Sequence, residues 1–426
     1  MPEDQPREAT LEAVLAAENL RAAWLAVKAN DGAPGVDGMD MEQSALHLRG
    51  HWEGMRAKLL AGDYVPGAVR AVDIPKPGGG KRRLGIPNIA DRLIQQAIHQ
   101  VLSPVWEPGF SDHSYGFRPG RSAHDAVRAA QAFVKEGKTW VIDIDLKDFF
   151  NRVDHDILMH RLRGKVGDKR LRALVGAYLR APVQQPGGGK DKRWKGVPQG
   201  GPLSPLLANI YLDPLDKELE KRGVSFVRYA DDIAIHASSQ RSAERIYGSV
   251  VAWIGKHLKL EVNRTKSGTG PCGQSSLLGF RLFEDGKVGI APKTIGKLKA
   301  KVRELWEARQ SRTSKQLRGQ WQRYIRGWWN YFQLAGWRRE VEDLGGWIRR
   351  HMRKCFWQRW KTPRGRLNAM KRLGVKGRAL GQCYSGRGAW AMSLHPVMQQ
   401  ALKNRTLYRY GFIIPWQVAA PSAAGG

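Results

Sequence analysis

A pair of acidic residues separates two apolar runs in the stretch VSFVRYADDIAIH, residues 224–236. Both runs carry the β-branched and aromatic residues that favour strands, so the stretch predicts a strand, a tight turn and a second strand. Adjacent carboxylates repel each other, and a hairpin turn does not require them. Because apolar strands would place Asp231 and Asp232 against a core, the pair indicates a functional site rather than a solvated surface turn.

A second strand with an acidic end is predicted over residues 140–146, where WVIDIDL alternates apolar and acidic residues. If this strand lies beside the 224–236 hairpin in one sheet, Asp145 and Asp231 converge. Two convergent carboxylates are suited to hold two Mg²⁺ ions about 3.5–4 Å apart, the arrangement used for in-line phosphoryl transfer. The pattern therefore predicts a two-metal site.

Around these carboxylates, ordered sequence blocks resemble those of bacterial group II intron-encoded reverse transcriptase/maturase proteins. YADD at residues 229–232 looks like the reverse transcriptase signature, and GVPQGGPLSPLLAN at 196–209 resembles the PQG block of that family. Further matching blocks are NDGAPGVDG at 30–38, IPKP at 74–77, RRLGIP at 82–87, SYGFRP at 114–119, LGF at 278–280, GWWNYF at 327–332 and WIRR at 347–350. The resemblance implies an α+β right-hand polymerase fold of fingers, palm and thumb, with an antiparallel palm sheet and a helical maturase domain.

The resemblance and the composition together predict four segments. These are an N-terminal extension with the start of the fingers (1–75), the reverse transcriptase fingers and palm (76–290), the maturase or thumb domain (291–378), and a short basic DNA-binding appendage with a flexible tail (379–426). Local patterns add a helix over residues 8–29, a strand hairpin over residues 71–86, and a helix capped by Asp91.

The resemblance also implies a role for each residue of the site. Asp145, Asp231 and Asp232 form the catalytic set, and Asp145 and Asp231 with the carbonyl of Leu146 are the implied Mg²⁺ ligands. The implied dNTP-binding residues are Lys76, Arg82, Phe150, Gln199 and Lys266. In this set the two cations Lys76 and Arg82 would grip the triphosphate, and Phe150 would pack under the deoxyribose and exclude a 2′-hydroxyl. Without the resemblance, the two cations would be assigned to a solvated turn and the phenylalanine to the core.

The charge of the chain indicates a polyanionic partner. Its 426 residues include 71 Lys and Arg against 39 Asp and Glu, a net charge of +32, and such an excess favours nucleic acid. Residues 291–380 hold 25 basic and 5 acidic residues, and ten of the 16 tryptophans lie beyond residue 290. The predicted nucleic-acid contacts in this segment are Arg323, Arg326, Arg338, Arg339, Arg349, Arg350, Arg353 and Lys354.

The function implied by the resemblance is that of an RNA-directed DNA polymerase encoded by a group II intron. The same chain would act as a maturase that binds the intron RNA, assists its splicing and supports retrohoming by target-primed reverse transcription. Its expected partners are the intron RNA, an RNA template with a DNA primer, target DNA and dNTPs, with two Mg²⁺ ions as cofactor. Two alternatives stay open: a domesticated group II-like reverse transcriptase in repair or antiviral defence, and a splicing-only RNA-binding maturase.

Several absences narrow the prediction further. The N-terminus has no secretory pattern and no stretch reaches 18 apolar residues, so we expect no membrane partner and a bacterial cytoplasmic, nucleoid-associated location. The three cysteines form no CxxC pair, which argues against a zinc finger. Residues 381–426 contain no Asp or Glu and only one histidine, His395, and one cysteine, Cys383. Because these are too few ligands for a nuclease metal site, the chain resembles endonuclease-less, class C-like members of the family.

Overall fold

The structure, a computed structural model, describes residues 9–75, 80–336 and 339–417, and the chain divides into two compact units, Met1–Pro271 and Cys272–Gly426. The division falls before the boundary expected at residue 290. The reason is that a hairpin of β9 (Phe280–Leu282) and β10 (Val288–Ile290) belongs to the second unit, where Phe280 packs 5.1 Å from the ring of Phe332. No helix among the described residues is long and apolar enough to span a membrane.

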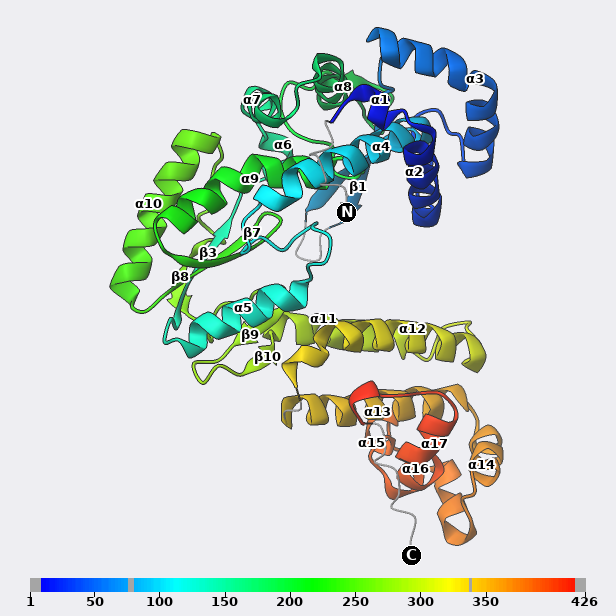
Figure 1. Ribbon diagram of the computed structural model, residues 1–426. Coiled ribbons are helices and arrows are strands. Elements are labelled where there is room, and N and C mark those ends of the chain that lie inside the picture. Colours follow the sequence, from blue (N-terminus) through cyan, green and yellow to red (C-terminus); the bar gives the residue numbers. More distant parts are fainter. Residues whose placement is uncertain (1–8, 76–79, 337–338, 418–426) are drawn as a thin grey trace, which may run out of the picture. The chain divides into compact units, whose positions relative to one another are not determined.

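A four-stranded antiparallel sheet with strand order β6-β7-β3-β8 forms the centre of the first unit (Figure 1). Its strands are β3 (Trp140–Asp145), β6 (Ser225–Tyr229), β7 (Asp232–Ala237) and β8 (Gly268–Pro271). The predicted strand, turn and strand are confirmed, with Ala230 and Asp231 in the turn. The register of β3 on β7 places Asp145 opposite Asp232, so the acidic ends of the two strands share one edge of the sheet.

A second four-stranded sheet, with strand order β2-β1-β4-β5, contains the expected hairpin. Its strands are β1 (Val69–Pro75), β2 (Lys81–Ile86), β4 (Val183–Gln184) and β5 (Lys190–Asp191). β1 and β2 pair antiparallel from Arg70 opposite Ile86 to Pro75 opposite Lys81, which confirms the hairpin prediction. The tip of this hairpin, residues 76–79, lies outside the described residues and includes the predicted Lys76.

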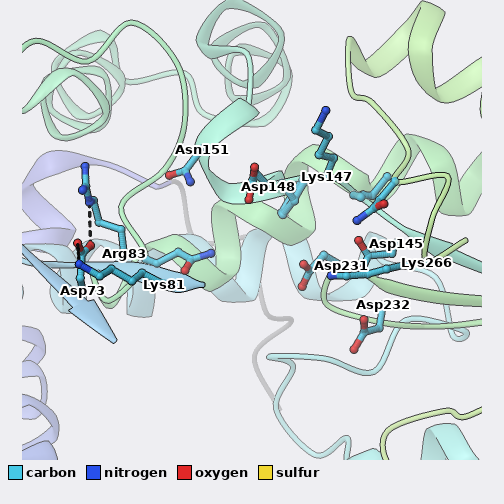
Figure 2. A pocket seen from close by; sticks show the side chains of 14 residues that line it. Asp73, Lys81, Arg83, Asp145, Lys147, Asp148, Asn151, Asp231, Asp232 and Lys266 are labelled. Atoms are coloured by element: carbon cyan, nitrogen blue, oxygen red, sulfur yellow. Dashed lines mark hydrogen bonds and ion pairs between the residues drawn. The ribbon is translucent and has the colours of Figure 1, made fainter. Parts of the chain in front are cut away.

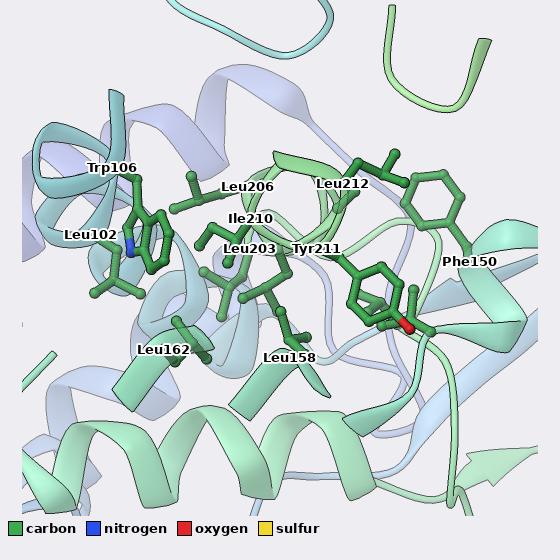
Figure 3. Close-up of a cluster of buried hydrophobic side chains, with 14 of the residues drawn as sticks. Leu102, Trp106, Phe150, Leu158, Leu162, Leu203, Leu206, Ile210, Tyr211 and Leu212 are labelled. Carbon is green, nitrogen blue, oxygen red and sulfur yellow. The ribbon is translucent and has the colours of Figure 1, made fainter. Parts of the chain in front are cut away.

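Helices supply most of the core of the first unit. They are α1 (Leu11–Val14), α2 (Ala17–Asn30), α3 (Met41–Ala61), α4 (Ile89–Trp106), α5 (Ala123–Lys135), α6 (Phe149–Arg152), α7 (His155–Lys165), α8 (Lys169–Arg180), α9 (Ser204–Lys221) and α10 (Gln240–Leu258). Pro205 stands in the first turn of α9, where a missing backbone N–H costs nothing. In Figure 3, Leu206 and Ile210 of α9 lie in one apolar cluster with Trp106 of α4 and Leu158 of α7. This cluster supports the helix that runs under the sheet edge with the carboxylates.

Two helix predictions were wrong in detail. The helix expected over residues 8–29 is broken at residues 15–16 into α1 and α2. Asp91 does not cap α4, because Asn88 occupies the N-cap position. The Asp91 carboxylate instead lies buried and accepts hydrogen bonds from the hydroxyls of Tyr64 (2.7 Å) and Tyr178 (3.2 Å). Tertiary hydrogen bonds thus outweigh the local capping preference of aspartate.

The second unit is helical, as predicted for the basic, tryptophan-rich segment. Its helices are α11 (Pro292–Leu305), α12 (Ser314–Phe332), α13 (Arg339–Arg359), α14 (Pro363–Arg372), α15 (Ala389–Met392), α16 (Pro396–Ala401) and α17 (Asn404–Arg409). Trp306, Trp321, Trp357 and Trp416 are almost completely buried, and the Trp306 and Trp321 rings meet edge to face at 5.6 Å. These tryptophans therefore belong to the core, and residues 418–426 lie outside the described part of the chain.

Candidate active site

An open cavity of about 880 Å³ lies where β3 and β7 end in the first unit (Figure 2). Its lining residues are Asp73, Lys81, Arg83, Asp145, Leu146, Lys147, Asp148, Phe149, Asn151, Gln199, Asp231, Asp232, Asn263 and Lys266. Six of these were predicted from sequence: Asp145, Leu146, Gln199, Asp231, Asp232 and Lys266. The fold thus brings together predicted residues that the chain separates by as many as 121 positions, the interval between Asp145 and Lys266.

Backbone and side-chain contacts fix the first carboxylate, Asp145, at the end of β3. Its backbone N–H donates to the Ser267 hydroxyl at 2.8 Å, and its carbonyl accepts from the N–H of Asn263 at 2.8 Å. Its carboxylate forms an ion pair with the Lys266 ammonium at 3.4 Å. The loop after α10 therefore holds both the backbone of Asp145 and the cation nearest to its carboxylate.

Three carboxylates lie close together at this edge of the sheet, and the strands themselves do not need this negative charge in order to form. Asp232 is exposed within the cavity, yet partial desolvation, followed by repulsion from Asp231 and Asp145, raises the pKa of Asp232 to about 6. A nearby positive charge would relieve this repulsion, because an opposite charge favours the ionised form of a carboxyl. Lys266 already lies close, but a single ammonium leaves the set of three carboxylates net negative.

The donor atoms at this edge suit a hard divalent cation. Among the described residues, no three His, Cys, Asp or Glu side chains are arranged to hold a metal ion by themselves. Mg²⁺, however, is commonly bound by one or two carboxylates and completed by water and substrate phosphate oxygens. Asp145 and Asp231 provide two such carboxylates, and Leu146 lines the same cavity. The residues present therefore fit a site that substrate oxygens complete.

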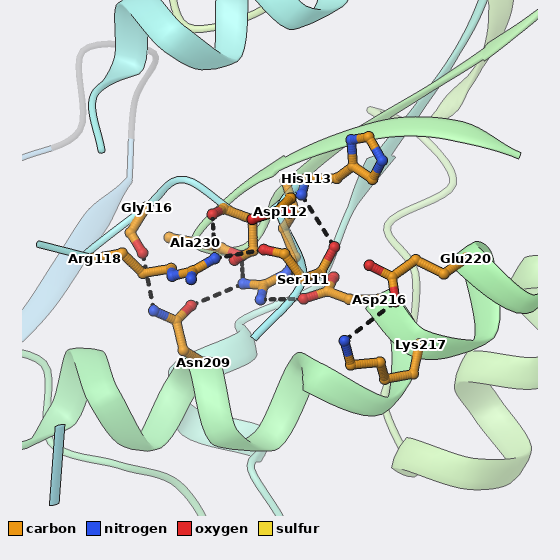
Figure 4. Close-up of polar contacts among 12 residues, drawn as sticks. Ser111, Asp112, His113, Gly116, Arg118, Asn209, Asp216, Lys217, Glu220 and Ala230 are labelled. Carbon is orange, nitrogen blue, oxygen red and sulfur yellow. Dashed lines mark hydrogen bonds and ion pairs between the residues drawn. The ribbon is translucent and has the colours of Figure 1, made fainter. Parts of the chain in front are cut away.

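A buried ion pair supports the turn that carries Asp231 (Figure 4). Arg228 of β6 and Asp216 of α9 are both fully buried, and the guanidinium contacts both carboxylate oxygens, Nε to Oδ1 at 2.7 Å and Nη2 to Oδ2 at 2.5 Å. The remaining nitrogen, Nη1, donates to Asn209 Oδ1 at 2.9 Å and to the Ala230 carbonyl at 3.0 Å. Burial nevertheless raises the pKa of Asp216, although Arg228 acts to lower it.

The same turn is packed so closely that it needs a glycine beside it. Ala230 adopts a left-handed conformation with φ of 58°, which costs energy in a residue with a Cβ. A Cβ on Gly116 would lie 2.3 Å from the Ala230 nitrogen, so only glycine fits there. The Asn209 amide donates to the Gly116 carbonyl at 2.9 Å, which joins the glycine to the Arg228 network. Strain next to Asp231 is therefore held in place by buried polar contacts.

The opposite wall of the cavity is cationic and includes residues that were not predicted. Lys81 and Arg83 of β2 line it, and both contact the Asp73 carboxylate, at 3.8 Å and 3.1 Å. The Arg83 hydrogen bond holds the pKa of Asp73 below its usual range. The predicted Arg82 lies between them in β2, but its side chain is outside the described part of the chain. Alternation along the strand could have suggested Lys81 and Arg83, which stand two residues apart and so share a face.

Phe150 and Gln199 occupy different surroundings from each other. Phe150 is 7% exposed and packs 5.1 Å from the ring of Phe149, and it is Phe149 that lines the cavity. The Gln199 carbonyl accepts a hydrogen bond from the Gly85 N–H at 2.7 Å. A Cβ on Gly200, whose φ is 127°, would lie 2.6 Å from the Gly85 carbonyl oxygen, so the loop needs a glycine to pack on β2. Phe150 does not itself line the cavity, and its role as a sugar gate stays a prediction.

The predicted cations of the second unit differ in exposure. Arg323 and Arg326 are exposed on α12, whereas Arg353 is 4% exposed and donates to the Leu402 carbonyl and to Asn404 Oδ1, both at 3.0 Å. Burial lowers the pKa of Arg353 to about 10. The Arg353 guanidinium thus makes its contacts inside the second unit, and the predicted phosphate contact of this residue stays a prediction.

The other predicted cations are partly exposed, or their side chains lie outside the described part of the chain. Arg350 stacks 3.7 Å from the centre of the Trp390 ring, and Lys354 and Arg349 are partly buried, with burial lowering the pKa of Arg349. Arg338 lies outside the described residues, and of Arg339 only the backbone, at the start of α13, is described.

Two family models match successive parts of the chain, and the first of them extends eleven residues past the end of the first unit. The family model for reverse transcriptase (RNA-dependent DNA polymerase) matches residues 74–282, and the model for the group II intron, maturase-specific domain matches residues 295–374. The first match contains every residue of the cavity except Asp73, which immediately precedes it.

Parts of the chain are also similar to individual proteins. Protein YkfC of Escherichia coli is 39% identical over 196 residues, which cover 45% of this chain and 51% of that protein. The group II intron-encoded protein LtrA of Lactococcus lactis is 39% identical over 171 residues, covering 40% of this chain and 28% of that protein. The chain thus spans about half or less of the length of these relatives. A telomerase structure from Candida albicans, at 12% identity and a TM-score of 0.43 over 87% of this chain and 70% of that chain, is too distant to bear on function.

Proposed function

We propose that the chain is a group II intron reverse transcriptase/maturase, which extends a DNA primer on an RNA template and also binds a group II intron RNA. The single observation that carries the polymerase proposal is the meeting of Asp145, Asp231 and Asp232 at the open end of β3 and β7, opposite a cationic wall. A carboxylate set that faces cations across a cavity suits a substrate with a phosphate chain and a metal requirement.

The carboxylates and the cations would divide the work of nucleotidyl transfer. The reverse transcriptase family uses a divalent metal, and Asp145 and Asp231, with the carbonyl of Leu146, would hold two Mg²⁺ ions. The chemistry that such ions supply when bound is activation of the primer 3′-hydroxyl and stabilisation of the pyrophosphate leaving group. Lys81 and Arg83 would exchange Asp73 for the triphosphate of the dNTP, since a phosphate chain offers more negative charge than one carboxylate. Lys266 would keep Asp145 oriented before substrate arrives.

Pocket shape would contribute to the choice of nucleotide. Gln199, held against β2 through its own carbonyl, lines the same cavity as the carboxylates and the cations. Phe149 forms part of the floor and rests on Phe150, so the bulk of the pair would limit the space available beside the deoxyribose. Phe150 would be the residue that packs under the deoxyribose and excludes a 2′-hydroxyl, with the Phe149 ring beside it.

The maturase role would belong to the second unit. Its exposed cations on α12, with their aromatic neighbours, are suited to the phosphates of a folded RNA, which proteins recognise mainly by shape and backbone. Binding of the intron RNA would assist splicing. In retrohoming, the polymerase would copy the intron from a primer end in target DNA. The class of intron and the absence of an endonuclease stay predictions.

The test of the polymerase proposal compares Asp231→Asn with Asp156→Asn, a matched change at an exposed aspartate of α7. Extension of a DNA primer on an RNA template should fall roughly 10³-fold for Asp231→Asn, the equivalent of several kcal/mol of transition-state stabilisation. Asp156→Asn should extend normally, and both variants should bind intron RNA like the wild type. Near wild-type extension by Asp231→Asn would remove the proposed role of the carboxylate pair.

A further inference from the structure

The segment KDKRWK at residues 190–195 exposes a tryptophan among cations. The Trp194 side chain is 73% exposed, and Lys190, Lys192 and Lys195 beside it are also exposed. The one acidic residue of the segment, Asp191, already accepts a hydrogen bond from the Gln185 amide at 2.5 Å. Within the described part of the chain, no ion pair involves any of these three lysines. The segment therefore presents an indole and three ammonium groups to solvent.

The backbone on both sides of Trp194 is fixed, although its side chain is exposed. Before it, β5 pairs with β4, and β4 pairs with β1 through Val183 opposite Val69. After it, the N–H of Gly196 donates to the Val153 carbonyl at 2.7 Å, and the N–H of Val197 donates to the Phe150 carbonyl at 2.6 Å. Burial of a large aromatic side chain stabilises a protein, so a tryptophan held out in water on an anchored segment points to a binding role.

The position of Trp194 connects it to the candidate active site. A smaller cavity of about 220 Å³ is lined by Trp194 and its neighbours Arg193 and Lys195. Three further residues of its lining, Arg83, Asn151 and Gln199, also line the 880 Å³ cavity. The two cavities therefore share part of their walls, with Trp194 in the lining of the smaller one and Asp145 in the lining of the larger one.

We propose that Trp194, Lys192 and Lys195 form a subsite for an unpaired nucleotide of the template strand, next to the position at which it pairs. The proposal rests on the polymerase function proposed above. An indole face accepts any base by stacking, and lysines that flank it can contact the adjacent phosphates without reading sequence. The template is the strand that brings unpaired bases to a polymerase site, whereas the primer is already paired. A single exposed ring with flanking cations matches one such nucleotide.

The test measures binding of two RNA–DNA hybrids by fluorescence anisotropy, one blunt and one with a single-stranded 5′ extension of the RNA template. Trp194→Ala should weaken binding of the extended hybrid about 5- to 140-fold, the change that the loss of one stacked base produces. Its affinity for the blunt hybrid should change less than twofold. Trp194→Phe should restore most of the lost affinity, because a phenyl ring can still stack. Tyr384→Ala serves as the matched control, since Tyr384 is a similarly exposed aromatic in the second unit.

A base analogue identifies which nucleotide is bound. With 2-aminopurine at the first unpaired template position, wild-type protein should quench fluorescence by stacking, and Trp194→Ala should not. Equal loss of affinity for both hybrids, no loss at all, or a loss confined to intron RNA would each overturn the proposal. These hybrids report binding without catalysis, so a chain that binds the extended hybrid through Trp194 but extends no primer would refute only the polymerase function.

Discussion

Removal of the charge on Asp216 should destabilise the first unit strongly, although the residue lies outside the cavity. Asp216→Asn keeps the shape of the side chain but leaves the Arg228 guanidinium fully buried without its counter-ion. Breaking a buried pair in this way typically costs roughly 3–5 kcal/mol. Because whole domains are stable by only about 5–15 kcal/mol, a large part of the stability of this unit would be lost.

The loss should be measured by hydrogen exchange, because a chain with two units need not unfold in one step. Some amides of β6 and β7 exchange only when the whole unit opens. Their protection factors should fall by roughly 10² to 10^3.5, the equivalent of about 3–5 kcal/mol. Glu218→Gln is the matched control on the same helix, where Glu218 forms a partly exposed ion pair with Arg222 at 2.8 Å. An exposed pair of this kind contributes roughly 0.3–0.5 kcal/mol, so protection should hardly change.

A double variant separates the stability of the network from its effect on the turn. Asp216→Leu combined with Arg228→Met replaces the ion pair by apolar groups, which is often neutral or stabilising. It also removes the hydrogen bond from Arg228 to the Ala230 carbonyl, one residue before Asp231. We expect near wild-type protection but slower primer extension, with kcat reduced more than KM is raised. Full extension by this variant would refute the positioning role, and a loss below about 1 kcal/mol in Asp216→Asn would refute the buried-charge argument.

Three further predictions address other parts of the chain. Phe150→Val should raise ribonucleotide relative to deoxyribonucleotide incorporation in competitive single-nucleotide extension, and an unchanged ratio would count against the sugar gate. Burial raises the pKa of Asp91 to about 6, above its unfolded value, so stability should fall as pH rises from about 4 to 6, and Asp91→Asn should flatten that slope in thermal melts. Arg323→Gln with Arg326→Gln should reduce the slope of log K against log salt for intron RNA by about one per lost phosphate contact, whereas weaker binding at an unchanged slope would point to packing.

The parts of the fold that could be predicted are those whose signal is local. Alternation of apolar and acidic residues located β3, and runs of β-branched and aromatic residues on either side of a turn located the hairpin of β6 and β7. The register that sets Asp145 opposite Asp232 depends on the pairing of strands distant in the sequence. It follows from the sequence only if both acidic strand ends are assumed to lie at the same edge of the sheet. By contrast, Asp91 is of a residue type that favours a cap, yet it stands in the first turn of α4 and its carboxylate accepts hydrogen bonds from the Tyr64 and Tyr178 hydroxyls instead.

The contacts that hold the site in place could not be predicted in full from the sequence. The residues that make them are distant in the chain, or their type and surroundings suggest another role. Arg228 stands in the middle of an otherwise apolar strand, and this conflict was itself a signal of a buried partner. Nothing in the sequence identifies Asp216, twelve residues earlier on a helix, as that partner. For Lys81 and Arg83, alternation along β2 indicates that the two side chains share a face, but only the fold shows that this face lies opposite the carboxylates.

Net charge alone cannot separate the cations that bind nucleic acid from those that hold the fold. The 25 basic residues of 291–380 include Arg353, which donates to the Leu402 carbonyl inside the second unit, and Arg350, which stacks on Trp390. A guanidinium used in this way is already desolvated and hydrogen-bonded, so a phosphate would have to displace contacts of similar strength. The electrostatic contribution to RNA binding must therefore come from fewer cations than the composition offers, with the exposed Arg323 and Arg326 among them.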